Sequence, residues 1–430
     1  MIGRLLQPND SAGGQPLTLR ARWVFPVVGP PLEQGMVEIS DGWITAVHDR
    51  PGPCTHDLGN VAIIPGLVNA HTHLELSDVT VPLQPARPFT AWLRAVMGYR
   101  RSRASGSGDP AAAGQRSVIQ GLTESTLNGT TSLGDIAGPG WQPLEMPSAQ
   151  PRLVSFLELL GLAPEQAPVQ LERAGKHLAA HGGAIRGLSP HAPYSVHPDL
   201  FRSLVDLAVT HRAPLAMHLA ETQEELELLA NGTGEFSRFL EELGVWRPDA
   251  LPRGSRPLDY LRELARVENG LVVHGNYLAE DDIDFLAEQP NLSVVYCPRT
   301  HAYFGHEPHP WRRLIARRVN VAVGTDSRAS NPDLSIWNEL LWLRRLAPDF
   351  DPAALLELGS INGARALGLE TSTGSVAPGK SADLAIVEFE PGNSGDPYAI
   401  LFRPGNCITT AMSAGEWSRR EAQSHADQVR

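Results

Sequence analysis

A pair of histidines one residue apart is the first feature of this sequence that could carry chemistry. His71 and His73 follow directly after the apolar run Ile63–Ala70. Residues two apart in a strand point to the same face, so both imidazoles can reach one metal ion. The spacing alone is weak evidence, because 15 histidines in 430 residues give about half a His-x-His match by chance. The position at the end of a buried run makes the pair a candidate metal site.

Three further residues with metal-binding side chains occupy the same position relative to an apolar run. His218, His274 and Asp326 each end such a run. Each one alone is more readily a capping or hydrogen-bonded residue than a ligand. If the runs are strands of one barrel, their carboxyl ends meet at one mouth, and the residues together predict a metal site there. Glu221, three residues after His218, is either a first-turn carboxylate favoured by the helix dipole or a proton shuttle that does not bind the metal.

The elements that must position these residues recur along the middle of the chain. Eight apolar runs alternate with helical patterns, which predicts a (β/α)₈ barrel of the TIM type, a fold that typically takes about 250 residues. A doubly wound open sheet is the alternative. The helical stretches include Pro332–Leu346, which Asn331 and Pro332 are expected to begin. The eight runs are Ile63–Ala70, Thr130–Ile136, Leu153–Leu159, Ala184–Ser189, Leu215–Leu219, Gly270–Val273, Leu292–Tyr296 and Val319–Val323.

Both ends of the chain follow a different pattern from the middle. Leu17–Val28, Met36–Val47 and Ala382–Phe389 carry strand-like apolar residues between turn signals. Two segments interrupt the strand–helix alternation, Tyr99–Gly114 and Asn231–Glu268. They are either surface insertions or lids over the end of the barrel that carries the site.

Several other residues are candidates for contacts with a substrate. His191 ends the fourth run and could touch substrate or metal, whereas Glu158, at the end of the third run, could also serve a neighbouring loop. Glu75 and Trp92 lie on the first loop, where Trp92 could equally be a packing residue. Three histidines follow the seventh run, and we expect a solvated loop there, with a substrate contact or a weak second metal site as alternatives: His301, His306 and His309.

Composition excludes several classes of protein. The 36 basic and 48 acidic residues give a net charge of −12, which argues against a nucleic-acid binder. Three separated cysteines form no Cys-x-x-Cys pair, so we expect no disulfide framework and a reducing cytoplasm. No apolar run approaches the length of a membrane span. His73 and Glu75 match the His-x-Glu half of a cytidine-deaminase zinc site, but the Pro-Cys-x-x-Cys half is missing.

The motifs together resemble a known family. Pro65–His73, His218–Glu221, Val273-His274, Gly324-Thr325-Asp326 and Gly374–Leu384 are similar to the amidohydrolase superfamily, in its deaminase branch. The nearest group is the S-adenosylhomocysteine, methylthioadenosine and aminodeoxyfutalosine deaminase-like proteins. This resemblance implies a metal-dependent barrel over residues 63–370, flanked by a small β-sandwich built from residues 1–62 and 371–430. It also implies a homodimer.

The resemblance implies a role for each candidate residue of the site. One divalent metal, Zn²⁺ or Fe²⁺, would be held by His71, His73, His218 and Asp326. Glu221 and His274 would work beside it, with Glu221 giving a proton to the substrate ring, His274 orienting the attacking water and Asp326 taking its proton. Arg328 stands where many relatives have a small residue, so it is a candidate for substrate contact.

The number of lysines bears on how many metals the site holds. The sequence has two, Lys176 and Lys380. Two-metal amidohydrolases commonly bridge their metals with a carboxylated lysine at the end of the fourth strand, and the fourth run, Ala184–Ser189, contains none. A guanidinium stays protonated and cannot replace it. One metal per chain is therefore expected.

The expected reaction is hydrolytic deamination of an aminated purine nucleoside, with release of ammonia. The segment Tyr296–His306 resembles the aminodeoxyfutalosine-type members, and S-adenosylhomocysteine is the other expected substrate type. The closest alternative is an amidohydrolase that opens a cyclic amide or removes a halide with the same ligands. A second alternative is an inactive barrel kept as a binding protein, which a complete ligand set disfavours.

Overall fold

The structure is a computed structural model that describes residues 16–105, 110–138, 150–247, 249–390 and 395–418. The predicted lid segments fall partly outside these ranges, since residues 106–109 and 248 are not described. The described part of the first segment contains the end of α1 and the start of α2, and that of the second contains α6 and α7 joined by a non-helical stretch. Among the described residues, no helix is both long enough and apolar enough to cross a membrane.

Eight parallel strands form one sheet that closes on itself. They pair in chain order from the first to the last. The first and last strands of the sheet meet beyond the end of the last strand. There the backbone N–H groups of Thr325 and Asp326 donate to the His71 carbonyl at 3.1 Å, and Thr72 and Asp326 form a parallel β-bridge. The predicted TIM barrel is confirmed, and the open sheet is excluded. The strands are β8 (Leu67–Thr72), β9 (Thr130–Ala137), β10 (Arg152–Leu159), β11 (Ile185–Pro190), β12 (Leu215–Leu219), β13 (Gly270–His274), β14 (Leu292–Tyr296) and β15 (Asn320–Val323).

Helices surround this barrel. In α4 the buried residues Leu200, Leu204 and Ala208 recur every four positions, the spacing of an amphipathic helix with one face on the core. The helices are α1 (Phe89–Ala104), α2 (Pro110–Leu127), α3 (Ala167–Ala179), α4 (Pro198–His211), α5 (Gln223–Asn231), α6 (Glu235–Glu242), α7 (Pro257–Leu264), α8 (Glu280–Ala287), α9 (Pro298–Phe304), α10 (Trp311–Ala316), α11 (Ile336–Leu346), α12 (Pro352–Leu358) and α13 (Ile361–Ala366), with short 3₁₀ turns at Leu74–Leu76 and Pro164–Gln166.

The predicted start of the helix at Pro332 is wrong. Helix α11 begins at Ile336, and Ser335 caps it by accepting from the Asn338 N–H at 3.2 Å. The Asn331 side chain is committed elsewhere, because its amide donates to the Thr325 carbonyl and to Glu339, both at 2.7 Å. The side chain of Asn331 therefore belongs to a buried polar network beside the barrel mouth and does not cap a helix, which is the role that the sequence pattern predicted for it.

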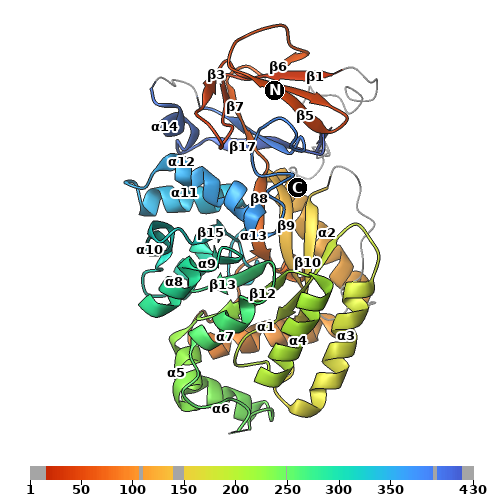
Figure 1. The fold of residues 1–430 in the computed structure, drawn as a ribbon, viewed down its shortest axis with the longest axis vertical. Helices are drawn as coiled ribbons and strands as arrows, with labels where there is room; N and C mark the ends of the chain where they lie inside the picture. The colour runs from red at the N-terminus through yellow and green to blue at the C-terminus, as the bar shows by residue number, and fades with distance from the viewer. Residues whose placement is uncertain (1–15, 106–109, 139–149, 248, 391–394, 419–430) are drawn as a thin grey trace, which may run out of the picture.

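Two further sheets lie at one end of the molecule, and helices α5 and α6 lie at the other end (Figure 1). A four-stranded sheet comes from the N-terminal part of the chain, and a six-stranded sheet combines strands from both ends. Leu19 and Val37 from the first sheet share one core with Ile63, Ile386 and Met412 from the second, which confirms a small β domain built from both chain ends. Helix α14 (Pro397–Leu401) lies between β16 and β17 in the chain. The strands are β1 (Leu17–Arg20), β2 (Trp23–Val24), β3 (Leu32–Glu33), β4 (Met36–Ser40), β5 (Trp43–His48), β6 (His56–Asp57), β7 (Val61–Pro65), β16 (Leu384–Glu388), β17 (Cys407–Ser413) and β18 (Glu416–Trp417).

The first apolar run, Ile63–Ala70, is shared between the two parts of the molecule. It is broken at Gly66: β7 pairs with β16 in the terminal sheet, and β8 enters the barrel. A Cβ on Gly66 would lie 2.1 Å from the Thr131 hydroxyl, so the crossing requires a glycine. Because β8 leaves the terminal sheets, its carboxyl end and the candidate residues that follow it lie at the far end of the barrel.

Candidate metal centre and active site

Three histidines meet at the carboxyl ends of the barrel strands. His71 and His73 come from the end of β8 and His218 from β12, and one ring nitrogen of each lies within 4.8 Å of the others. Asp326, three residues after the end of β15, places its Oδ1 3.6 Å from His71 Nε2 and 3.5 Å from His73 Nε2. The barrel thus brings together four residues that are up to 255 positions apart in sequence, all with side chains that bind divalent metals.

The protonation and hydrogen bonding of this cluster suit a cation. All four residues are buried. Both ring nitrogens of His71 and Nδ1 of His73 have no hydrogen-bond partner among the described residues. Burial, and then the neighbouring rings, hold the pKa values of His73 and His218 well below the usual histidine range, which keeps their imidazoles neutral. Neutral imidazoles with free nitrogens are the form that binds a metal.

Hydrogen bonds to backbone and side chains orient the cluster. His218 Nδ1 lies 3.0 Å from the His191 carbonyl, so Nε2 is the nitrogen available to the site. Ser330 donates to Asp326 Oδ2 at 2.8 Å, and Thr72 donates to the Asp326 carbonyl at 2.9 Å. Such outer contacts fix the orientation of metal ligands and are typical of built metal sites.

The backbone at the strand ends is strained where the candidate residues stand. Ala220, His274 and Asp326 have φ values of 53°, 69° and 56°, in the left-handed region that non-glycine residues rarely adopt. Each such residue costs on the order of 1–3 kcal/mol, and such strain concentrates at functional sites. The three strained residues lie at the carboxyl ends of β12, β13 and β15 or within three residues after them. This is the end of the barrel at which the candidate side chains meet.

Glu221 and His274 form a second pair beside the cluster. His274 Nε2 lies 3.4 Å from Glu221 Oε1. Burial first, and then the charges of Asp326 and Glu225, raise the pKa of Glu221 well above its usual range, whereas burial lowers the pKa of His274 to about 3. The pair therefore combines a carboxyl group whose proton is held more tightly than usual with an imidazole that stays unprotonated.

Asp326 has the opposite electrostatic character. Burial opposes its ionised form, but the His71, His73 and His274 rings outweigh burial and hold its pKa below the ordinary range. Two buried carboxyl groups in one site thus have pKa values shifted in opposite directions, a pattern that separates a proton donor from a proton acceptor.

The turn that carries Glu221 depends on a residue that the sequence analysis missed. Glu225 is fully buried, and its carboxylate accepts from the N–H groups of Ala220 and Glu221, both at 2.9 Å. Burial raises the pKa of Glu225 to about 7. Thr222 caps α5 by accepting from the Glu225 N–H at 3.1 Å. The Thr-x-x-Glu spacing of a capping box was the available signal.

A small cavity of about 60 Å³ lies against the cluster. His73, His218, Glu221, His274 and Asp326 line it, as do the predicted contact residues Glu158, Trp92 and His191. Helix α1 contributes Trp92, Val96 and Arg100. Arg100 was not predicted, although its spacing of four from Val96 and eight from Trp92 places it on the same helix face.

Arg100 links two carboxylates of the predicted set. Its guanidinium contacts Glu75 and lies 3.7 Å from Glu158, and Glu158 in turn is 4.0 Å from His191 Nε2. Glu75 also accepts from Arg103 at 3.4 Å and does not line the cavity. The structure therefore places Glu158 and His191 at the cavity and Glu75 behind Arg100.

Two other predicted features differ from expectation. Arg328 lies outside the cavity, because its guanidinium donates to the Val79 and Thr80 carbonyls and pairs with Glu124 at 2.8 Å. The expected solvated histidine loop is partly buried: His309 is 9% exposed and its Nε2 lies 2.8 Å from the His274 carbonyl. His309 therefore supports the strained backbone at His274.

Comparison with known proteins agrees with this geometry. The amidohydrolase family model matches residues 62–418. The 5-methylthioadenosine/S-adenosylhomocysteine deaminase of Syntrophobacter fumaroxidans is 29% identical over 383 residues, which cover 84% of this chain and 81% of the relative. The aminodeoxyfutalosine deaminase of Deinococcus radiodurans is 32% identical over 331 residues, covering 72% of this chain and 74% of the relative.

A solved structure shares the fold over nearly the whole chain. The crystal structure of an adenosine deaminase from Xanthomonas campestris with bound zinc has a TM-score of 0.71 and 24% identity, and the match covers 93% of this chain and 92% of that one. Because the family model spans both the barrel and the strands of the terminal β domain, this chain belongs to the amidohydrolase family, in its deaminase branch.

Proposed function

We propose that this protein is a metal-dependent hydrolytic deaminase that releases ammonia from an aminated purine nucleoside. The observation that carries the proposal is the position of Glu221, 3.4 Å from His274, in a cavity that His73, His218 and Asp326 of the metal-binding cluster also line. The similarity to deaminases that act on methylthioadenosine, S-adenosylhomocysteine and aminodeoxyfutalosine supports the substrate class.

One divalent ion would be held by His71, His73, His218 and Asp326, with zinc as the first choice and iron as the second. Imidazole nitrogens and one carboxylate suit both ions, and bound zinc in the similar adenosine deaminase supports the first. When bound, such an ion would supply a nucleophile at neutral pH, because zinc can lower the pKa of a bound water from 15.7 to about 7.

The protein residues then divide the proton transfers between them. Asp326, ionised and held by Ser330, takes a proton from the attacking water. Glu221, whose pKa burial raises, gives its proton to the ring nitrogen next to the carbon that carries the amine. His274 is 3.4 Å from Glu221 and orients the water. The proton on Asp326 leaves with the amine as ammonia, and the remaining proton of the added hydroxyl returns to Glu221 as the C–N bond breaks, so that water and an aminopurine yield an oxopurine and ammonia and Glu221 is restored.

The arrangement of lysines supports a single ion. Strand β11, the fourth strand of the barrel, contains no lysine. Lys176 is on α3, where it pairs with Glu172 at 2.6 Å, and Lys380 donates to the Glu370 carbonyl. No lysine of the described residues reaches the cluster, so none could be carboxylated to form the carbamate that bridges two metals.

The proposal is tested by ammonia release from a panel of aminopurine nucleosides. We expect stoichiometric ammonia and the ultraviolet change from aminopurine to oxopurine with at least one member of the panel. A cyclic amide opened, or a halide released, in place of deamination would assign the site to another reaction of the same family.

A further inference from the structure

The strained backbone of Asp326 needs support from its surroundings. Its φ of 56° lies in the left-handed region that residues with a side chain rarely adopt. Such a conformation persists only where the surrounding structure fixes it. The angle φ turns Asp326 against the planar peptide group before it, which contains the Thr325 carbonyl and the Asp326 N–H. The contacts of this one peptide group therefore bear directly on where the Asp326 carboxylate points.

Hydrogen bonds hold this peptide group on both of its edges. On one edge the Asp326 N–H donates to the His71 carbonyl at 3.1 Å. On the other edge the Thr325 carbonyl accepts from the side-chain amide of Asn331 at 2.7 Å and from the Thr300 hydroxyl at 3.3 Å. Asn331 and Thr300 are both buried. The first contact belongs to the barrel, whereas the other two come from the loop after β15 and from α9.

Glu339 fixes Asn331 in the position from which it reaches the Thr325 carbonyl. Glu339 lies in the first turn of α11 and is fully buried. Its Oε1 accepts the second donation of the Asn331 amide at 2.7 Å, and its Oε2 accepts from the backbone N–H of Arg299 at 2.9 Å. Because the Asn331 amide donates to two fixed acceptors, it cannot rotate without losing both hydrogen bonds.

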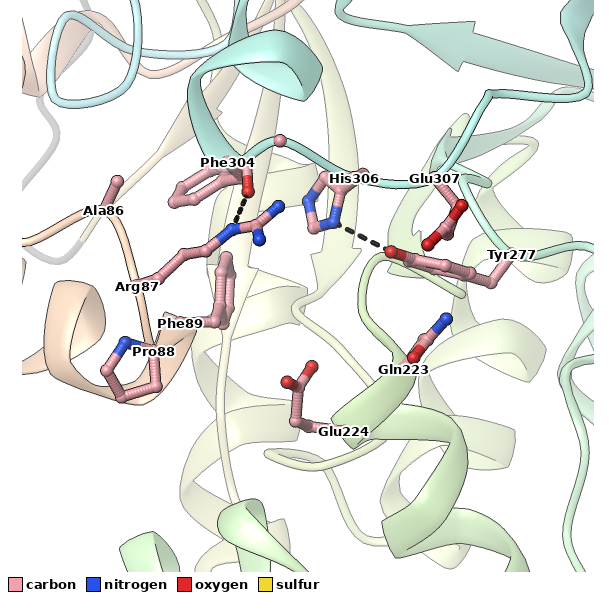
Figure 2. Close-up of a pocket in the computed structure, with 11 residues that line it drawn as sticks. Ala86, Arg87, Pro88, Phe89, Gln223, Glu224, Tyr277, Phe304, His306 and Glu307 are labelled. Carbon is pink, nitrogen blue, oxygen red and sulfur yellow. Dashed lines mark hydrogen bonds between the residues drawn. The ribbon is translucent and has the colours of Figure 1, made fainter.

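The charge of Glu339 is balanced by Arg299, at the start of α9. Arg299 Nε donates to Glu339 Oε1 at 2.7 Å, and its two terminal nitrogens donate to Asp333 at 2.6 and 2.8 Å. Helix α9 is also held at its far end, where Arg87 donates to the Phe304 carbonyl (Figure 2). The partner of Glu339 therefore belongs to a helix that is anchored at both ends.

A carboxylate buried as deeply as Glu339 calls for a reason other than stability. Burial raises its pKa, and Arg299 and Asn331 oppose that shift. An ion pair in the interior is often no more stable than an apolar pair of the same volume, so it is weak evidence for a stabilising role. Glu339, Asn331 and Arg299 do not line the cavity at the metal centre. An effect of this network on the reaction therefore passes through the residues that it holds.

We propose that Glu339 is a positioning residue for Asp326, the carboxylate ligand of the proposed metal centre. Through Asn331, Glu339 holds the Thr325 carbonyl and thereby the peptide plane that directs the Asp326 carboxylate toward the histidine cluster. This inference rests on the metal site of the proposed function and adds to it a residue that touches neither metal nor substrate. Outer contacts of this kind are worth about 10- to 100-fold in metal affinity.

The test measures zinc affinity by competition with a chromogenic chelator, with no substrate present. Glu339→Gln removes the charge that holds Asn331 and Arg299 but keeps the size of the side chain. We expect its zinc dissociation constant to rise about 10- to 100-fold. In zinc-saturated protein, kcat should fall with little change in KM, because Glu339 makes no contact in the cavity where substrate would bind.

Asp333→Asn is the matched control. Asp333 pairs with the same arginine at 2.6 Å, and its other hydrogen bonds within the described residues go to Ser335 and Asn338. Both variants loosen Arg299, so both should lower the melting temperature of the metal-free protein. Asp333→Asn leaves the link from Asn331 to the Thr325 carbonyl in place, so it should leave zinc affinity unchanged.

Asn331→Ala tests the same link from its other end, and it provides the comparison if Glu339→Gln folds poorly. It removes the donations to Glu339 and to the Thr325 carbonyl together. We expect a loss of zinc affinity at least as large as in Glu339→Gln. The double variant should lose no more than Asn331→Ala alone, because both changes break one connection.

Three results would overturn the inference. One is a zinc affinity that neither Glu339→Gln nor Asn331→Ala changes. Another is an equal loss in Asp333→Asn, which would mean that the network contributes stability alone. The third is additive losses in the double variant, which would mean that the two residues act separately. Failure of the deaminase proposal looks different: the wild-type protein would then bind zinc without releasing ammonia, and the zinc affinities would still decide the role of Glu339.

Discussion

The acid–base chemistry proposed for the site depends on the opposite pKa shifts of Glu221 and Asp326. Both carboxyl groups are buried, yet the pKa of Glu221 is raised and the pKa of Asp326 is lowered. The difference lies in their neighbours: the rings of His71, His73 and His274 lower the pKa of Asp326, whereas the charges of Asp326 and Glu225 add to burial in raising the pKa of Glu221. Burial alone would give both the same shift, so the placement of the histidines decides which group gives a proton and which accepts one.

The role of Glu221 is tested by Glu221→Gln. We expect the variant to keep its metal, because Glu221 is not among the proposed ligands, and to lose about 10²- to 10⁴-fold in kcat, the usual contribution of a general acid. Elemental analysis and steady-state kinetics measure the two quantities. Glu227→Gln, an exposed residue of the same helix, is the control and should behave as wild type. Full activity in Glu221→Gln would contradict the assignment.

At the scale of single elements, the turn between β12 and α5 couples stability to pH. The pKa of Glu225 is raised by burial from 4.5 to about 7. The folded state therefore holds this proton more tightly than the unfolded chain. The stabilisation is fully present below pH 4.5 and is lost as pH rises through 7, with a total of about 3 kcal/mol at 1.36 kcal/mol per unit.

Glu225→Gln removes this titration while keeping an oxygen acceptor for one of the two N–H groups. We expect the wild-type melting temperature to fall more steeply than that of the variant between pH 4.5 and 7. Thermal unfolding of both proteins in parallel measures the difference, and other titrating groups cancel in the comparison. Parallel pH profiles would show that Glu225 is not protonated in the folded state near neutral pH.

Some elements could be predicted from sequence because their signals are local. Strands β12 and β14 match the predicted runs residue for residue, since a short apolar run between turn residues is typical of a buried strand. The start of α11 could not be predicted, because Asn331 bonds to Glu339 and the Thr325 carbonyl in the folded barrel. Tertiary contacts there override a good local capping signal.

In the site too, residues with a local sequence signal could be predicted, whereas residues placed by tertiary contacts could not. His71, His73, His218, His274 and Asp326 could be found because each lies at the carboxyl end of a strand or within three residues after it. Arg100 was missed because it reaches the cavity from a helix, far in sequence from the other residues of the site that could be predicted by their place at a strand end. Arg328 is adjacent to the site in sequence but is bound by Glu124 and two carbonyls. Proximity in sequence does not show where a long side chain points.

At the scale of the whole molecule, Gly66 joins the terminal β domain to the barrel. Gly66→Ala should destabilise the protein by about 1–3 kcal/mol or more, because its Cβ would overlap Thr131. Thr131→Ala in the same chain should restore part of the loss. Gly98→Ala is the control, since a Cβ there meets nothing within 4 Å. Melting temperatures compare the four proteins, and an unaffected Gly66→Ala would show that the crossing has room to adjust.

The positions of the lysines in the whole molecule limit how many metal ions the chain can hold. Because no lysine of the described residues reaches the cluster, we expect about one tightly bound ion per chain, which elemental analysis of the purified protein measures. A chelator should remove the ion together with activity and lower the melting temperature, since a ligand bound to the folded state stabilises it. Two ions per chain would contradict the single-ion proposal. The homodimer implied by the sequence resemblance stays a prediction.

The central claim is that this barrel deaminates purine nucleosides, and ammonia release tests it most directly. The measurement uses protein shown to carry one ion per chain, incubated with S-adenosylhomocysteine, methylthioadenosine and aminodeoxyfutalosine. We predict one ammonia for each oxopurine formed with at least one substrate, and loss of both products in Glu221→Gln. No ammonia from any of the three, with the ion in place, would contradict the claim.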